Sequence, residues 1–139
     1  MADKTSKVSI VTPERVIYSD EARLVIARGT DGELGILPEH APLITSLEIG
    51  ALRLQKDGHW KTLAVSGGFM EVKDSRIVVL ANAAELPEQI DVERARRAKE
   101  RAEQRLASKA QEVDLLRAEA ALKRALLRLR VAEQGDKYH

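Results

Sequence analysis

Glycine and proline almost disappear from this chain of 139 residues after residue 90. All four prolines and every glycine except Gly135 lie before that point. Residues 91–134 consist mainly of Ala, Arg, Glu, Leu and Lys, which are the strongest helix formers. Because glycine and proline mark turns and helix ends, the change predicts two modules with different secondary structure.

The first module predicts short β-strands. Runs rich in Val, Ile and Leu alternate with polar residues, as expected for strands that bury one face. Turn signals separate the runs at intervals of about 8–12 residues. Many short strands with regular turns are typical of an antiparallel sandwich or barrel. The turn signals are Thr30-Asp31-Gly32, Leu37-Pro38, Lys56-Asp57-Gly58, Ser66-Gly67-Gly68 and Lys73-Asp74-Ser75, and the strands 8–13, 15–19, 22–29, 51–55, 61–67, 70–73 and 76–81.

The second module predicts two helices, at about 91–106 and 112–132. Asp91 suits the N-cap position, and the segment between the helices contains few residues that break a helix. One continuous helix of 44 residues, about 66 Å long, is therefore also compatible with the sequence. Apolar stripes run along both halves, at Val92, Ala95, Ala98, Ala102 and Leu106, and as a heptad seam at Leu115, Ala118, Leu122, Ala125, Leu129 and Ala132.

These patterns together predict an α+β protein with two domains. An antiparallel β-sandwich is expected at residues 1–87, and a helical domain at 88–139. The two helices are expected to form an antiparallel hairpin that can open into an extended rod.

Composition argues against several classes of protein. There is no cysteine, which excludes a disulfide framework, a zinc–thiolate site and a thiol nucleophile. No apolar run approaches the roughly 18 residues needed to cross a bilayer, and the polar start lacks a signal-peptide core, so a cytoplasmic protein is expected. The three histidines are scattered, and the motifs of hydrolases, phosphate loops and zinc proteases do not occur, so we expect neither a catalytic nor a metal site.

Positive charge is concentrated in the helical module. Residues 1–90 hold ten basic and thirteen acidic residues, whereas 91–139 hold thirteen and nine. The only aromatic residue of the basic half is Tyr138, so it offers no platform for base stacking, and nucleic acid is not an expected partner.

The spacing of the arginines suggests a site for a polyanion. Seven residues make about two helical turns, so arginines seven or four apart share one face. Guanidinium groups bind phosphate oxygens through paired donors and stay charged. The alternative is a solvated face on which the arginines pair with Glu100, Glu103 or Glu119. The two sets are Arg94 and Arg101, and Arg117, Arg124 and Arg128.

Six stretches, in order, carry a resemblance to a known family. They are VSIVTPERVIYS, GELGILPEHAPLITSLEIG, AVSGGFMEV, VVLANAAE, IDVERA and RAEAALKRALLRLRVAE. With this order and the change from β to α composition, the chain resembles the epsilon subunit of bacterial F-type ATP synthases from Val8 to Glu133.

The resemblance implies a non-catalytic subunit of the rotor stalk. The sandwich would contact the gamma subunit and the c-ring, and the helices would permit ATP hydrolysis when folded down and block it when extended among the alpha and beta subunits. Glu33 and His40 correspond by position to the foot that meets the c-ring, with Glu33 in a loop. The location implied is peripheral, on the cytoplasmic face of the bacterial membrane.

The segment Ile90-Asp91-Val92-Glu93-Arg94-Ala95 matches the I/L-D-x-x-R-A pattern of family members that bind ATP in the folded hairpin. By the same resemblance, the adenine end would meet Glu85, Ile90, Asp91 and Ala95. The phosphates would meet Arg94, Arg101, Arg124 and Arg128, with Arg117 nearby.

ATP is accordingly expected as a regulatory ligand that is not hydrolysed here, and the sequence does not decide whether Mg²⁺ accompanies it. Only the hairpin gathers the arginines, so ATP would favour the folded state. A free-standing ATP-sensing module that acts on another partner is the alternative.

Overall fold

The computed structural model describes residues 4–108 and 111–135. The ends of the two expected domains, 1–3 and 136–139, lie outside the described residues. Strands come first and helices second, as predicted. The elements are β1 (Ser6–Val11), β2 (Val16–Ala22), β3 (Leu24–Gly29), β4 (Gly32–Ile36), β5 (Leu43–Lys56), β6 (His59–Lys73), β7 (Arg76–Ala81), β8 (Ala84–Glu85), the 3-10 helix η1 (Pro87–Gln89), α1 (Val92–Ala107) and α2 (Glu112–Gln134).

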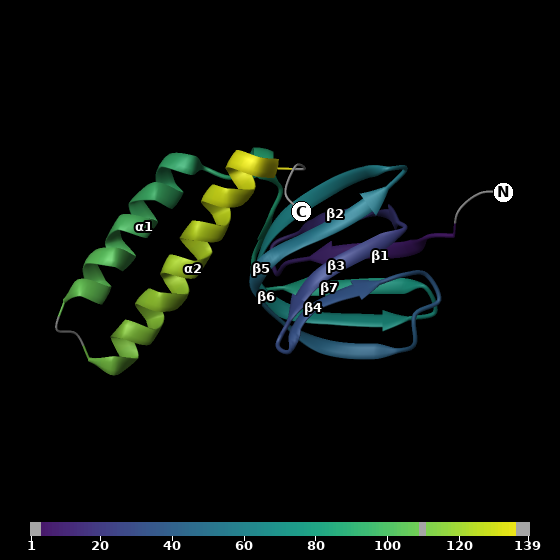
Figure 1. Cartoon of the computed structure of the whole chain (residues 1–139), viewed down its shortest axis with the longest axis horizontal. Coiled ribbons are helices and arrows are strands. Elements are labelled where there is room, and N and C mark those ends of the chain that lie inside the picture. The colour runs from purple at the N-terminus through teal and green to yellow at the C-terminus, as the bar shows by residue number, and fades with distance from the viewer. Residues whose placement is uncertain (1–3, 109–110, 136–139) are drawn as a thin grey trace.

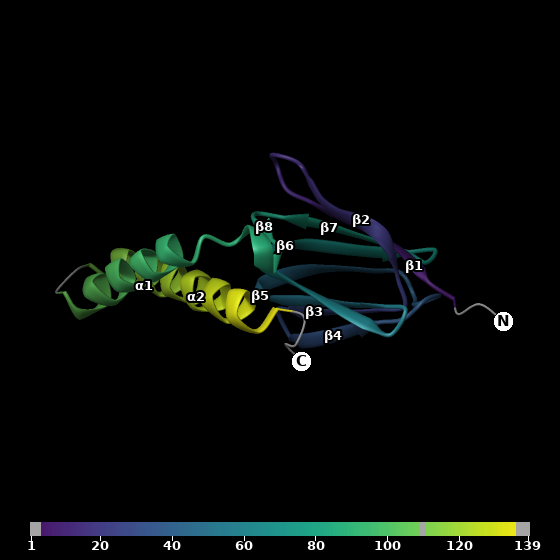
Figure 2. The same cartoon turned by 90° about the horizontal axis from the view of Figure 1, so that it is seen from above.

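The strands form one sheet that curls over on itself into the expected sandwich (Figures 1 and 2). Its order is β2-β1-β7-β6-β5-β3-β4, with β8 paired to β6. Neighbouring strands are antiparallel except for β1 and β7, which run parallel. The predicted antiparallel sandwich is therefore confirmed, and the β1–β7 pair departs from it because β1 pairs with a strand from a distant part of the chain.

The core of the sandwich lies between its two layers. Its largest side chains are almost completely buried, and they come from nearly every strand. They include Val8, Ile10, Val25, Ile36, Leu52, Leu54, Leu63, Met70, Val72, Ile77 and Val79.

Gly67 and Gly68 do not form the predicted turn but lie inside the long strand β6. Leu63 and Val65 point into the core before them, whereas Met70 and Val72 do so after them, so the inward face changes from odd to even positions. Both glycines have positive φ, and a Cβ on Gly68 would lie 2.8 Å from the Ala81 Cα and closer still to the Leu80 carbonyl oxygen. The glycines are thus the point where β6 bends against β7.

Three strand segments lie where the sequence predicted none. β4 contains two glycines within five residues, Leu43–Gly50 forms the first half of β5 rather than a loop, and β8 is only two residues long. Ile44 in that half is largely exposed, which weakens the alternation of polar and apolar residues. By contrast, the predicted turns at Lys56-Asp57-Gly58 and Lys73-Asp74-Ser75 are confirmed.

The two helices lie side by side and antiparallel, with α2 between α1 and the sheet (Figure 1). The prediction of two helices is confirmed to within two residues at each end. Asp91 is the N-cap of α1, and its Oδ1 accepts a hydrogen bond from the Arg94 N–H at 3.1 Å. Ser108 ends α1, and its hydroxyl donates to the Arg105 carbonyl oxygen at 2.7 Å.

A small second cluster of buried side chains fixes α2 to the sheet. Ile90, Leu127 and Val131 pack on Ala64 of β6, with Ile49 and Ala51 of β5 beside them. We call this cluster the joint. The whole helical domain is attached to the sandwich through it and through the link at residues 86–91.

Replacing Gly68 with alanine is expected to lower the free energy of unfolding by about 3 kcal/mol, because the new Cβ strains the backbone and meets β7. Gly35→Ala, in β4, is the control, since a Cβ there would lie 3.8 Å from the nearest atom, the Leu24 Cδ1. Urea denaturation of both variants measures the difference, and equal stabilities would contradict the bend assigned to Gly68.

Candidate functional site

The contact between the two helices is built from alanines. Ala95 and Ala102 are the buried residues of α1, and Ala118 and Ala125 are the corresponding pair of α2. The methyl side chains let the helix axes approach closely. Ala95, a predicted nucleotide contact, is 3% exposed, so it serves the packing of the helices.

The predicted arginines occupy matching positions on the two helices. Arg94 and Arg101 each stand one residue before a buried alanine of α1, and Arg117 and Arg124 do the same on α2. One residue is a rotation of about 100°. In an antiparallel pair of helices, the residues that precede the contact residues project to the same side of the pair on both helices. The four arginines therefore lie on one side of α1 and α2 (Figure 1).

Arg128, one turn beyond Arg124, continues this line toward the end of α2. The structure therefore gathers on one side of the helix layer all five arginines that sequence spacing singled out. We call them the arginine row: Arg94, Arg101, Arg117, Arg124 and Arg128.

The link between the domains brings the other predicted residues to one end of this row. Glu85 ends β8, Ile90 packs in the joint and Asp91 caps α1. The Glu85 Oε1 accepts a hydrogen bond from the Arg128 Nε at 2.5 Å, in an ion pair whose side chains are 29% and 31% exposed. The start of α1 and the end of α2 meet here (Figure 1).

Most of the row has no ion-pair partner among the described residues. Among the described residues, Arg94, Arg101, Arg117 and Arg124 make no ion pair within 4.0 Å, and on α1 it is Arg96 that pairs, with Glu93. The alternative of a row neutralised by Glu100, Glu103 or Glu119 is therefore not what the structure shows. Clustered guanidinium groups of this kind are suited to phosphate oxygens.

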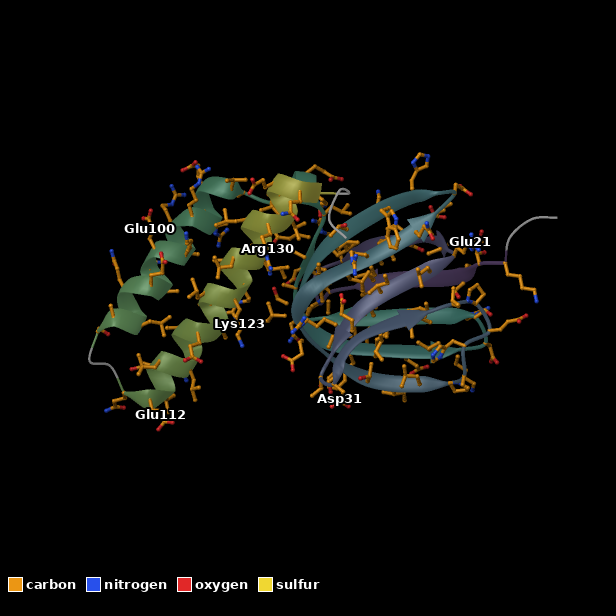
Figure 3. All side chains as sticks on the ribbon, in the orientation of Figure 1. Glu21, Asp31, Glu100, Glu112, Lys123 and Arg130 are labelled. Carbon is orange, nitrogen blue, oxygen red and sulfur yellow. The ribbon has the colours of Figure 1, made fainter. Side chains whose placement is uncertain are left out.

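A groove of about 740 Å³ lies on a different face, between α2 and the sheet. In Figure 3, Lys123 and Arg130 extend from α2 on the side that faces the sandwich. In the described part of the chain, none of the predicted nucleotide contacts lines it. Its charged lining is Arg28, Glu33, Glu48, Glu119, Lys123 and Arg130.

The two residues predicted to meet the c-ring are not brought together. Glu33 lies within β4 rather than in the expected loop, accepts a hydrogen bond from Arg53 at 3.3 Å and lines the groove. His40 lies in the loop after β4, next to Glu39, whose carboxylate pairs with Lys4 at 2.8 Å. β1 begins at the end of the sandwich far from the helices (Figure 1), close in sequence to Lys4, so β4 separates the positions of Glu33 and His40.

The groups with shifted pKa values are Tyr18 and Asp20 of β2 and Lys56 at the end of β5. The Lys56 ammonium donates to both Asp20 oxygens, which lowers the pKa of Asp20 and raises that of Lys56. The pKa of Tyr18 is raised, mainly by burial and also by the nearby Asp20. These groups fasten β2 to the hairpin and serve the fold.

An apolar patch on the outer face of the sheet was missed by sequence reasoning. Phe69 of β6 lies opposite Leu80 of β7, with Val78 and Ile44 on the same face, and all four are exposed. The sequence does contain a signal for this patch, because each of these apolar residues stands at a position of its strand where the alternation predicts a polar residue. An apolar residue in a strand is normally assigned to the core, so the signal was overlooked. Such a patch is typical of an interaction surface.

Two family models match consecutive parts of the chain. The ATP synthase delta/epsilon chain β-sandwich domain matches residues 5–87, and the long α-helix domain of the same chain matches 88–133. The chain therefore belongs to the ATP synthase delta/epsilon chain family.

The relatives with high identity are bacterial. The ATP synthase epsilon chain of Desulforamulus reducens is 62% identical over 130 residues, which cover 94% of this chain and 98% of that protein. That of Shouchella clausii is 52% identical over 129 residues, covering 93% and 96%. These findings confirm the predicted resemblance to bacterial epsilon subunits and support a non-catalytic subunit.

A solved structure has the same fold at low identity. A chain of the cryo-EM structure of the Euglena gracilis mitochondrial ATP synthase has a TM-score of 0.78 and 23% identity, over 93% of this chain and 81% of that one. Within the described residues, the helices are too short or too polar to span a membrane.

Asp91 is both an N-cap and a predicted nucleotide contact, and two variants test the first of these roles. Asp91→Ala removes the cap and is expected to destabilise the helical domain by about 1 kcal/mol. Asp91→Ser keeps a capping oxygen without the charge and should retain helix stability. Circular dichroism during thermal unfolding measures both variants, and equal losses would contradict the capping role.

Proposed function

We propose that this chain is the epsilon subunit in the central stalk of a bacterial F-type ATP synthase, and that its helical domain restrains ATP hydrolysis when ATP is scarce. Membership of the family supports the first part. The second part, the ATP-sensitive restraint of hydrolysis, is supported by the arginine row, which has five arginines on one side of two helices in contact.

ATP is the proposed ligand of the row. Its phosphates would be held by the arginines, and its adenine end would lie near the link, toward Glu85, Ile90 and Asp91. The triphosphate supplies several negative charges to a row that is largely without counter-ions, so binding relieves repulsion as well as forming hydrogen bonds. Mg²⁺ enters the proposal only as an ion that would be bound to the ATP phosphates.

Binding of this kind favours one conformation of the helices. The row exists only while α1 and α2 lie side by side, because an extended rod distributes the arginines along its length. A ligand that binds one state alone shifts the equilibrium toward it, by about 1.4 kcal/mol at ten times its dissociation constant. When ATP falls, α1 and α2 are free to open, and the basic arm can reach the alpha and beta subunits.

The sandwich carries the proposed contacts with the rotor. The exposed patch of Ile44, Phe69, Val78 and Leu80 suits an apolar surface of the gamma subunit. Glu33 and His40 stay proposed contacts of the c-ring. Because they lie at different ends of β4, the c-ring loops would have to extend along this edge strand. Through these contacts the chain would be held at the cytoplasmic face of the membrane.

The arginine row predicts a selective loss of nucleotide affinity. Arg94→Ala and Arg124→Ala should each weaken ATP binding to the isolated chain about tenfold or more, because each removes a charged donor to phosphate. Arg130→Ala, on the groove side of α2, should leave the affinity unchanged. Isothermal titration calorimetry measures all three, and unaltered binding in both row variants would exclude the site.

The exposed patch predicts a loss of rotor binding without a loss of stability. Phe69→Ser should weaken binding to the gamma subunit about tenfold, as for an aromatic anchor, since Phe69 is 59% exposed and contributes little to the core. Val16→Ser on β2, with Val16 58% exposed, is the matched control. If both variants bind gamma equally well, the patch is not the interface.

Copurification with the membrane complex would separate this function from the free-standing ATP-sensing module. Family membership favours the rotor subunit.

A further inference from the structure

The ion pair of Glu85 and Arg128 connects the two domains. Glu85 ends β8, Arg128 lies in the last two turns of α2, and the two residues are 43 positions apart in sequence. The Arg128 Nε lies 2.5 Å from the Glu85 Oε1, and only 31% of the arginine side chain and 29% of the glutamate side chain are exposed. The pair thus stands beside the joint, where Leu127 and Val131 meet the sheet.

Arg128 has two competing uses. As a member of the arginine row it is a proposed ligand of phosphate, yet its Nε already donates to a carboxylate. A phosphate that approached Arg128 along that direction would meet the negative charge of Glu85. A phosphate that binds through the edge containing Nε must displace Glu85, and one that binds through the two Nη groups meets a guanidinium whose charge is already paired with a carboxylate.

We propose that Glu85 is an internal competitor of the nucleotide's phosphates for Arg128. This inference rests on the proposed nucleotide site: Glu85 keeps its proposed place near the adenine and gains a second role through its contact with Arg128, a proposed phosphate ligand. In the ligand-free protein, the carboxylate takes the place of a phosphate and helps to hold the helices on the sandwich. When the nucleotide binds, the phosphates displace Glu85 and take over the guanidinium.

Two properties follow from this exchange. The folded helices keep one ion pair to the sandwich even without ligand, so they do not open as soon as ATP leaves. The ligand must also carry enough charge to displace a carboxylate, which favours a triphosphate over a monophosphate. Glu85 would therefore set both how readily the helices open when ATP leaves and how strongly the site prefers a triphosphate to a monophosphate.

Inorganic tripolyphosphate tests the competition without any contribution from adenine. Titrated into the full chain at low salt, it should bind the Glu85→Gln variant about fivefold more tightly than the parent, because Arg128 is released from an ion pair. Glu88→Gln is the matched control, since Glu88 is an exposed carboxylate on η1, three residues away. It should bind as the parent does.

A second measurement follows the helices in the absence of ligand. The chain has no cysteine, so spin labels can be placed uniquely at Asp31→Cys and Glu112→Cys, in the β3–β4 turn and at the start of α2 (Figure 3). Electron–electron distance measurements should show a larger open fraction in Glu85→Gln than in the parent or Glu88→Gln. High salt should open the parent and change Glu85→Gln little.

The outcomes separate this inference from the proposed function. If the parent binds tripolyphosphate and Glu85→Gln binds it no more tightly, the competition is overturned and the nucleotide site stands. If tripolyphosphate and ATP bind neither protein, the nucleotide site is excluded and the competition with it. An unchanged open fraction in Glu85→Gln would overturn the part of the proposal that concerns holding the helices.

Discussion

The attachment of α2 to the sheet is the contact on which the state of the helical domain depends. Ile90, Leu127 and Val131 bury their side chains there against Ala64. Each contributes roughly 2 kcal/mol, so the joint amounts to about 6 kcal/mol before the entropy of ordering the helices is subtracted. Since α2 lies between α1 and the sheet, both helices are held on the sandwich by this small cluster, together with the link at residues 86–91 and the ion pair of Glu85 and Arg128.

A joint of this size makes small electrostatic terms decisive. The partly exposed ion pair of Glu85 and Arg128 contributes up to about 1 kcal/mol, and a ligand at ten times its dissociation constant about 1.4 kcal/mol, so either one changes the ratio of docked to open helices severalfold. The alanine contact between the helices has a related consequence. Because Ala95, Ala102, Ala118 and Ala125 allow close approach, the arginines next to them come near one another, and the packing that forms the hairpin also gathers its charge.

Sequence reasoning was most successful where one periodicity extends over many residues. The two helices, the Asp91 cap and most strands followed from it. It failed at Gly67 and Gly68, because a bend inside a strand and a turn between strands have the same residue requirement, namely positive φ. It also missed β4 and the first half of β5, where glycines and the exposed Ile44 interrupt the alternation.

The amino-acid sequence by itself determined which residues share a helix face, since a rotation of about 100° per residue is a local property of the backbone. It therefore placed Arg94 with Arg101, and Arg124 with Arg128, and the resemblance supplied a ligand for them. Only the tertiary structure decided that both sets lie on one side of the helix pair, that Glu85 faces Arg128, and that β4 separates Glu33 from His40. These relations depend on how elements distant in sequence pack together, which no local pattern encodes.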